Sequence, residues 1–136
     1  MAEAGLNGTR AVWVVEDDPA AAALAAELCA VGDAEATLFA SALPFLAALQ
    51  DGLAPPAAVV LDWRLERELS AGAFLAIRHR FADVPVIYWT GIPLRELPAM
   101  IRDDPRTLGV DKAHGAEAFE RALAWALATG GVKPKP

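Results

Sequence analysis

The sequence predicts an α/β protein built around a single parallel sheet. Short apolar segments rich in β-branched residues alternate with longer segments whose apolar residues recur at helical spacing, which is typical of βαβ units. The 136 residues correspond to one domain, and 55% of them are hydrophobic, so the chain can bury a core without disulfides or a structural metal. These observations favour a sheet that is covered by helices on both faces.

The first half of the chain contains two strands and two helices. AVWVV at 11–15 is apolar on both faces and reads as a buried strand that stops at an acidic run. Asp18 is the expected N-cap of a helix that begins at Pro19 and ends at Gly32. A short second strand (ATLF) and a helix capped by Ser41 follow. The expected apolar stripes of these helices are Leu24, Leu28 and Val31, and then Leu43, Leu46 and Leu49.

The second half continues the alternation. AAVVL at 57–61 and PVIYW at 85–89 read as buried strands, and 108–110 reads as a weaker last strand. A polar, charged loop is expected at 63–71. Three helices are expected, and Pro98 shortens or kinks the middle one. Their apolar stripes are Phe74, Ile77 and Phe81; Leu94, Leu97 and Ile101; and Phe119, Leu123 and Leu127.

The order of the predicted elements also predicts how the sheet is assembled. Five strands and five helices alternate strictly, and right-handed crossovers then lead to a doubly wound, three-layer sandwich. The flavodoxin-like strand order 2-1-3-4-5 is the natural choice at this size. We expect one domain at 11–129, with a leader at 1–10 and a tail at 130–136.

Charge and cysteine content exclude several classes of function. The net charge of −6 and the pI of about 4.8 disfavour direct binding to nucleic acid. The single cysteine, Cys29, forms neither an internal disulfide nor a zinc cluster and is expected in the core. There is no apolar run long enough to span a membrane and no signal peptide. We therefore expect a cytoplasmic protein that binds neither nucleic acid nor membrane.

Side chains that can carry chemistry stand at the ends of four predicted strands. Glu16 and Asp17 follow the first strand, Asp62 the third, Thr90 the fourth and Lys112 the fifth. The carboxyl ends of parallel strands meet at one rim, so these side chains are expected to converge there. Carboxylates this close repel one another, and their hard oxygen atoms suit Mg²⁺. A carboxylate nucleophile beside Mg²⁺, a hydroxyl and an ammonium is a set suited to phosphoryl transfer.

Four short motifs lie at these strand ends. They are VVEDDP at 14–19, VVLDW at 59–63, PVIYWTG at 85–91 and VDK at 110–112. With these motifs the chain resembles the receiver domains of two-component response regulators, and is similar to the chemotaxis regulators among them, over roughly residues 10–128. The resemblance implies a bacterial signalling domain of flavodoxin-like fold that becomes phosphorylated.

The resemblance also implies a role for each residue of the rim. Asp62 would be the phosphoacceptor, and Thr90 and Lys112 would contact the phosphoryl group. The implied ligands of Mg²⁺ are Glu16, Asp17, Asp62 and the backbone carbonyl of Arg64. The implied phosphodonor is a phosphohistidine on a histidine kinase or a histidine phosphotransfer protein. The chain would then catalyse at most its own phosphorylation and dephosphorylation. Phosphorylation would switch an interaction face formed by the fourth helix, fifth strand and fifth helix, and a homodimer through this face is one possible interaction.

Some positions depart from the family pattern. Ala113 stands where proline usually follows the lysine, so a cis peptide bond is not expected there. Gly109 stands where the family often has an aromatic switch residue, which leaves the usual coupling to Thr90 without one partner. YWTG at 88–91 is partly similar to a variant receiver subfamily with Phe-Ala-Thr-Gly at this place.

Two other functions are considered. A pseudo-receiver, which binds partners independently of phosphorylation, typically lacks the acceptor, the acidic pair or the lysine, and all of these are present here. A metal-dependent phosphatase with an aspartyl nucleophile commonly carries a second aspartate two residues later, where this chain has Arg64, which cannot serve as a general acid. Trp63 and Trp89 are interpreted as packing residues, and His79 as part of a solvated basic helix face.

Overall fold

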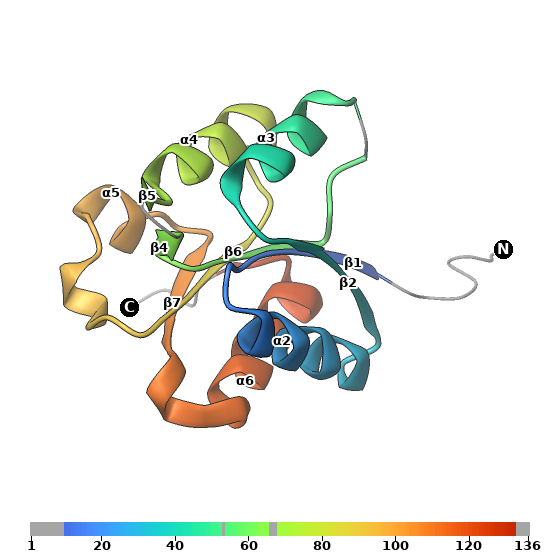
Figure 1. Ribbon diagram of the computed structural model, residues 1–136, viewed down its shortest axis with the longest axis vertical. Coiled ribbons are helices and arrows are strands. Elements are labelled where there is room, and N and C mark those ends of the chain that lie inside the picture. Colours follow the sequence, from blue (N-terminus) through green and yellow to red (C-terminus); the bar gives the residue numbers. More distant parts are fainter. Residues whose placement is uncertain (1–9, 53, 66–67, 133–136) are drawn as a thin grey trace, which may run out of the picture.

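A parallel sheet forms the centre of the protein, as the computed structural model in Figure 1 shows. The structure describes residues 10–52, 54–65 and 68–132. Within these ranges the main sheet has five strands in the order β2-β1-β3-β6-β7, all parallel. They are β1 (Arg10–Val15), β2 (Ala34–Phe39), β3 (Ala58–Leu61), β6 (Val86–Thr90) and β7 (Thr107–Asp111). Counted along the chain, this is the predicted order 2-1-3-4-5, and the prediction is confirmed.

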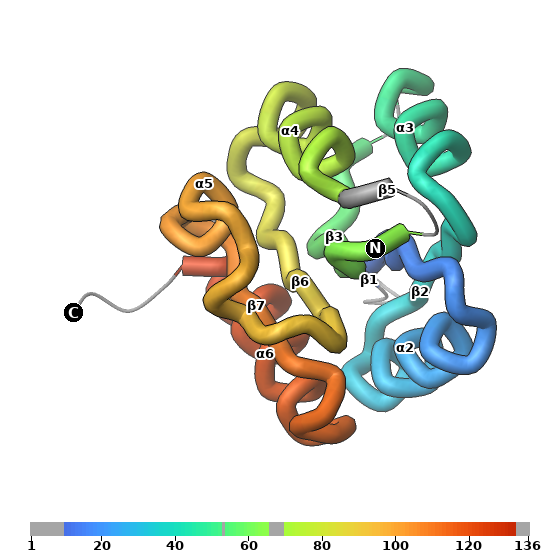
Figure 2. Tube along the Cα trace, turned by 60° about the vertical axis from the view of Figure 1, so that its left-hand side comes forward, coloured from blue at the N-terminus to red at the C-terminus, as the bar shows by residue number. Residues whose placement is uncertain are grey.

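Helices cover both faces of the sheet. They are α2 (Pro19–Val31), α3 (Ala42–Gln50), α4 (Ala71–Arg80), the short α5 (Ala99–Arg102) and α6 (Gly115–Thr129). Figures 1 and 2 show α3 and α4 together on one side of the sheet and α2 and α6 together on the other. The short helix α5 lies near the β7 edge and contributes Ile101 to the core on the α3–α4 side. The three-layer sandwich is therefore confirmed.

Each face of the sheet has its own hydrophobic core. On the α3–α4 side, Trp13 from β1 meets Phe39, Phe45 and Phe81 edge-on, with ring centroids 5.8, 6.1 and 6.4 Å away. The core on the α2–α6 side is built mainly from aliphatic residues of the central strands and from alanines of the two helices. Strands β3 and β6 are buried along their whole length, because both of their faces are covered.

The buried face of α2 differs from the predicted one. Leu28 is buried as predicted, but Leu24 and Val31 are 39% and 72% exposed. The other buried residues of α2 are Ala22, Ala25 and Cys29. In α3, likewise, the predicted Leu43 is exposed, and the core residues are Ala42, Phe45 and Leu49. Both helices are apolar on most faces, so helical spacing alone does not select the buried one. The small side chains on the buried face let α2 lie close to the sheet. Because Cys29 is among the buried residues, the pKa of its thiol is raised to about 11.

The helix ends follow the local signals that the sequence carries. The Asp18 side chain accepts a hydrogen bond from the Ala21 amide at 3.0 Å, and Gly32 ends α2, both as predicted. Ser41 stands at the N-cap of α3 without a side-chain capping bond. Pro98 divides the predicted fourth helix into the 3₁₀ turn η1 (Leu94–Glu96) and α5, because proline cannot donate the hydrogen bond that a continuous helix needs.

Two segments contain more structure than the sequence predicts. The polar loop expected at 63–71 holds a small antiparallel pair, β4 (Arg64–Leu65) and β5 (Glu68–Leu69). In the expected tail, Gly131 is buried against Pro85, and the carbonyl of Gly130 accepts a hydrogen bond from Arg106 at 2.8 Å. Residues 1–9 of the expected leader and 133–136 of the tail lie outside the described residues. Among the described helices, none has the length and hydropathy that a membrane crossing needs.

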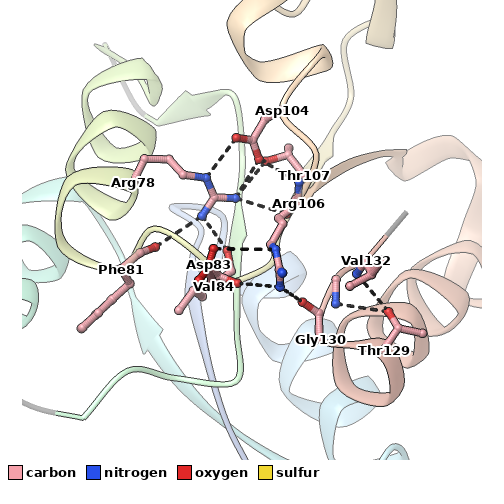
Figure 3. Close-up of polar contacts among 11 residues, drawn as sticks. Arg78, Phe81, Asp83, Val84, Asp104, Arg106, Thr107, Thr129, Gly130 and Val132 are labelled. Carbon is pink, nitrogen blue, oxygen red and sulfur yellow. Dashed lines mark hydrogen bonds and ion pairs between the residues drawn. The ribbon is translucent and has the colours of Figure 1, made fainter. Parts of the chain in front are cut away.

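Arg78 in the last turn of α4 joins three segments, as Figure 3 shows. Its guanidinium makes a two-point contact with the carboxylate of Asp104, Nε to Oδ1 at 3.2 Å and Nη2 to Oδ2 at 2.8 Å. It also donates to the carbonyl of Val84 at 2.6 Å and to that of Arg106 at 3.2 Å. Arg78 therefore ties α4 to the segments that lead into β6 and β7. His79, the next residue, is exposed as expected, but the solvated face does not include Arg78.

Asp104 is expected to make stability depend on pH in the acid range. Burial alone would raise the pKa of Asp104, but hydrogen bonds from Arg78 and Thr107 outweigh burial and hold it below its usual value. The ionised form is thus favoured by folding. The stabilisation is present above the unfolded pKa of about 3.9 and is lost as the pH falls through the lower folded pKa.

The Asp104→Asn variant tests this dependence. It should unfold at a lower temperature than the wild type at neutral pH, and the difference should shrink as the pH falls below the unfolded pKa of about 3.9 and through the lower folded pKa of Asp104. Thermal unfolding followed by circular dichroism across this range is the measurement. Asp103→Asn, at the exposed neighbouring position, is the matched control. A constant difference between wild type and Asp104→Asn at every pH would contradict the prediction.

Candidate functional site

The site lies at the carboxyl ends of the central strands. Glu16 follows β1, Asp62 follows β3 and Lys112 follows β7, while Thr90 is the last residue of β6. Parallel register aligns these ends, and Thr90 stands opposite Asp111 on the neighbouring strand. From β1 the chain adds β2 on one side of the sheet and then β3 on the other side. The carboxyl ends of β1 and β3 therefore flank the topological switch point, where doubly wound sheets bind ligands.

Three carboxylates gather at this rim. Glu16, Asp17 and Asp62 each offer an oxygen, and these oxygens all lie within 4.8 Å of one another. Glu16 and Asp62 are only 4% and 9% exposed. Backbone amides orient both groups, because the Asp18 N–H donates to Glu16 Oε2 at 3.1 Å and the Arg64 N–H donates to Asp62 Oδ1 at 3.3 Å. The acidic cluster predicted from the sequence is therefore assembled by the fold.

Lys112 brings a positive charge into this cluster. Its Nζ lies 2.7 Å from Glu16 Oε1 and 3.1 Å from Asp62 Oδ2, so one ammonium bridges two carboxylates. Lys112 begins the 3₁₀ turn η2 (Lys112–His114), and the Asp111 side chain caps this turn by accepting the Ala113 amide at 2.8 Å. The described residues contain no cis peptide bond, in keeping with alanine at position 113.

Burial and charge shift the pKa values of this group. Burial raises the pKa of Glu16 above its usual value, although hydrogen bonds from Lys112 and from the Asp18 amide oppose the shift. Burial alone would lower the pKa of Lys112, but its hydrogen bonds to Glu16 and Asp62 outweigh burial and raise it. Lys112 therefore stays protonated at neutral pH. A further cation would stabilise the two buried carboxylates, because the one ammonium that bridges Glu16 and Asp62 offsets only one of their two charges.

Trp89 forms the floor beneath Lys112. The Lys112 Nζ lies 5.2 Å from the centre of the Trp89 ring, within the range of a cation–π contact. Trp89 is 4% exposed and packs edge-on against Phe119 of α6, with ring centroids 4.9 Å apart. Trp63, the other tryptophan beside the site, is 9% exposed and packs against Tyr88 at 6.3 Å. The sequence interpretation of Trp89 as a packing residue missed its contact with the ammonium.

Thr90 and Arg64 complete the set of predicted residues. Thr90 is 1% exposed, and its hydroxyl accepts a hydrogen bond from the Ile92 amide at 3.5 Å. Arg64 reaches the cluster through its amide, while its side chain is exposed; a metal-binding role for its carbonyl stays a prediction. Gly109 occupies the position where the family often has an aromatic residue. The Leu94 side chain covers it, and a Cβ added at Gly109 would lie 3.0 Å from Leu94 Cδ2.

The donor set suits a small, hard divalent cation. Three carboxylate groups whose oxygens lie within 4.8 Å of one another, two of them mostly buried, are the ligands that Mg²⁺ uses in proteins. Cys29 is remote from the rim in the α2–α6 core, and the described part of the cluster contains no histidine, so a soft thiolate or imidazole site is not formed there. The residues therefore fit the predicted cofactor.

Comparison with known proteins bears on the fold. No family model matches the sequence, and no curated protein matches it. Solved receiver domains do match its structure. The receiver domain of a Pseudomonas aeruginosa sensor histidine kinase, described with magnesium in the active-site cleft, is 18% identical with a TM-score of 0.73, over 88% of this chain and 98% of that one.

Two further structures give the same result. A response regulator receiver domain from Clostridium thermocellum is 15% identical with a TM-score of 0.76, over 89% of this chain and 96% of that one. A chemotaxis response regulator of Vibrio cholerae is 16% identical with a TM-score of 0.75, over 88% of this chain and 99% of that one. The chain therefore has the fold of a response-regulator receiver domain.

Proposed function

We propose that this protein is a phosphoacceptor receiver domain that takes a phosphoryl group onto Asp62. The observation that carries the proposal is the placement of the Asp62 carboxylate, which lies in an acidic cluster and within 3.1 Å of the Lys112 ammonium. A carboxylate held in this way is positioned as a nucleophile, and a neighbouring cation can offset the charge that phosphoryl transfer brings. The receiver-domain fold supports the same function.

In the proposed reaction an oxygen of Asp62 forms a bond to phosphorus as the phosphorus–nitrogen bond of a phosphohistidine breaks. The bonding pair stays with the imidazole nitrogen, and a proton from water completes the neutral imidazole. The product is an aspartyl phosphate. Lys112 is positioned to donate hydrogen bonds to the phosphoryl oxygens, and the Thr90 hydroxyl stands at the neighbouring strand end, where it can donate another.

Glu16, Asp17 and Asp62 would hold Mg²⁺, with the Arg64 carbonyl as the predicted further ligand. When bound, Mg²⁺ supplies positive charge that neutralises carboxylates and phosphoryl oxygens together. The backbone amides of Asp18 and Arg64 keep Glu16 and Asp62 pointing into the site. The chain would therefore carry out its own phosphorylation and dephosphorylation without acting as an enzyme on other substrates.

The proposed partners follow from this chemistry. The phosphodonor is a histidine kinase or a histidine phosphotransfer protein in the cytoplasm. Phosphorylation would draw Thr90 and Lys112 towards the phosphoryl group and bias the end of β6, α5, β7 and α6 towards a second arrangement. This face, which corresponds to the predicted fourth helix, fifth strand and fifth helix, would bind an output partner or a second copy of the chain.

Intact mass spectrometry after incubation with acetyl phosphate and Mg²⁺ tests the proposal. We expect one added phosphoryl group on the wild type, none on Asp62→Asn, and none when a chelator removes the metal. Asp111→Asn is the matched control. It removes another carboxylate at the rim, and the amide oxygen of the asparagine can still accept the hydrogen bond from the Ala113 amide. An adduct that persists in Asp62→Asn would contradict the assignment. A wild type that neither gains mass nor binds beryllofluoride, a phosphoryl mimic, would indicate a pseudo-receiver instead.

A further inference from the structure

The contact between Lys112 and Trp89 joins the site to the core beneath it. The four-carbon stem of Lys112 is flexible and the Lys112 side chain is 26% exposed, so the carboxylates alone do not fix where the ammonium lies. The indole of Trp89 closes the side away from solvent at 5.2 Å. The ammonium is therefore held between two carboxylates and one aromatic face.

The indole itself is fixed from below. Phe119 of α6 is fully buried and packs against the Trp89 ring at an interplanar angle of 64°. The backbone of β6 is paired with β3 as far as Tyr88 and with β7 at Trp89 itself, whose partner is Val110. Trp89 thus presents to the ammonium a ring that is held by its strand and by Phe119.

Packing alone does not explain an indole at this position. The buried Nε1–H of Trp89 has no hydrogen-bond partner among the described residues, and an unsatisfied buried donor is destabilising. A phenyl ring or a leucine side chain would fill much of the same space without that donor. The feature that the indole adds is its electron-rich face, and that face meets the Lys112 ammonium.

We propose that Trp89 is the positioning residue for Lys112. The face of its indole holds the Lys112 ammonium at the rim, where the phosphoryl group on Asp62 would arrive. The inference rests on the proposed phosphoacceptor function. A cation is attracted most strongly to tryptophan, less to phenylalanine and not at all to an aliphatic side chain. Phosphorylation should therefore become slower in the order wild type, Trp89→Phe, Trp89→Leu, by roughly threefold at the first step and roughly tenfold overall.

The first measurement does not depend on phosphorylation. The chain has three lysines, and the other two are Lys133 and Lys135 near its end. In protein labelled with ¹³C at lysine, the side-chain methylene signals of Lys112 should be shifted upfield by the ring current of the indole, and Lys112→Arg identifies which signals these are. The shift should be reduced in Trp89→Phe and absent in Trp89→Leu.

The second measurement is the rate of phosphorylation by acetyl phosphate at saturating Mg²⁺. Trp13→Leu is the matched control, since it removes a buried indole from the opposite face of the sheet, where its ring contacts are Phe39, Phe45 and Phe81. This control should lose stability but keep the lysine signals and the phosphorylation rate per folded molecule. If Trp89→Leu does not fold, Trp89→Phe carries the comparison.

The outcomes separate this inference from the proposed function. Lost ring-current shifts together with the graded slowing support it. Lysine signals that are unchanged in both Trp89 variants overturn it, whether or not the protein becomes phosphorylated, and so does an unchanged rate in variants that have lost the shift. A wild type that shows the ring-current shift but is never phosphorylated contradicts the phosphoacceptor function and, with it, the positioning role.

Discussion

Arg78→Ala is expected to lower the free energy of unfolding by about 4 kcal/mol, because it breaks a largely buried ion pair and several hydrogen bonds at once. The Arg78 and Asp104 side chains are 16% and 15% exposed, so water does not readily replace the guanidinium. The carboxylate of Asp104 and the carbonyls of Val84 and Arg106 would all lose a donor. Denaturant unfolding at neutral pH measures the change.

Two variants separate the contributions to this loss. Arg78→Lys keeps the charge but not the planar fork, and we expect it to recover about half of the lost stability. Arg80→Ala is the matched control in the same helical turn. Arg80 is exposed and donates to the Leu49 carbonyl at 3.1 Å, so its loss should cost about 1 kcal/mol or less. A loss of similar size for Arg78→Ala and Arg80→Ala would contradict the role of Arg78.

Lys112→Met is expected to reduce the rate of phosphorylation of Asp62 by about 100-fold or more, since it removes a charged donor aimed at the reacting group. It should also lower the free energy of unfolding by about 2 kcal/mol when a chelator is present, because Glu16 and Asp62 then face each other without the ammonium between them. Rates with acetyl phosphate and denaturant unfolding provide the two readouts.

Added Mg²⁺ should restore the stability of Lys112→Met but not its rate. A divalent cation can balance the carboxylates, so we expect it to stabilise the variant more than the wild type. Lys112→Arg is the control that keeps the positive charge; it should recover most of the stability and part of the rate. If Lys112→Met were as stable as the wild type in chelator, the ion pairs would contribute little to the fold.

The strands and the rim could be predicted from the sequence because their signals are local. The first and third strands along the chain are unbroken apolar runs, and an abrupt change to Glu16 or Asp62 marks where each ends. The last strand has a weaker apolar signal, but Asp111 and Lys112 mark its end in the same way. The topological rule then places those ends together. The buried faces of α2 and α3 could not be predicted in this way, since leucines and alanines surround both helices and only the contact with the sheet decides between them.

Contacts between distant loops were beyond sequence reasoning. Arg78 stands in a run of three basic residues that looks solvated, and its partners lie in connecting segments whose paths no local pattern predicts. The contact between Lys112 and Trp89 could not be predicted either, because it depends on which face of the sheet each of the two side chains points to. An available signal was the tryptophan directly before Thr90, at the end of a strand that leads to the rim.

The ion pairs of the rim also bear on the order in which the chain can fold. Lys112 pairs with Glu16 across 96 positions of sequence and with Asp62 across 50. A chain synthesised from its N-terminus therefore exposes both carboxylates long before their counter-charge exists. Without a bound cation, their mutual repulsion disfavours closure of the rim in partly folded intermediates, and docking of β7, the last strand, brings the ammonium that relieves it. The assembled site is in this sense a late marker of folding, present only after the whole sheet has formed.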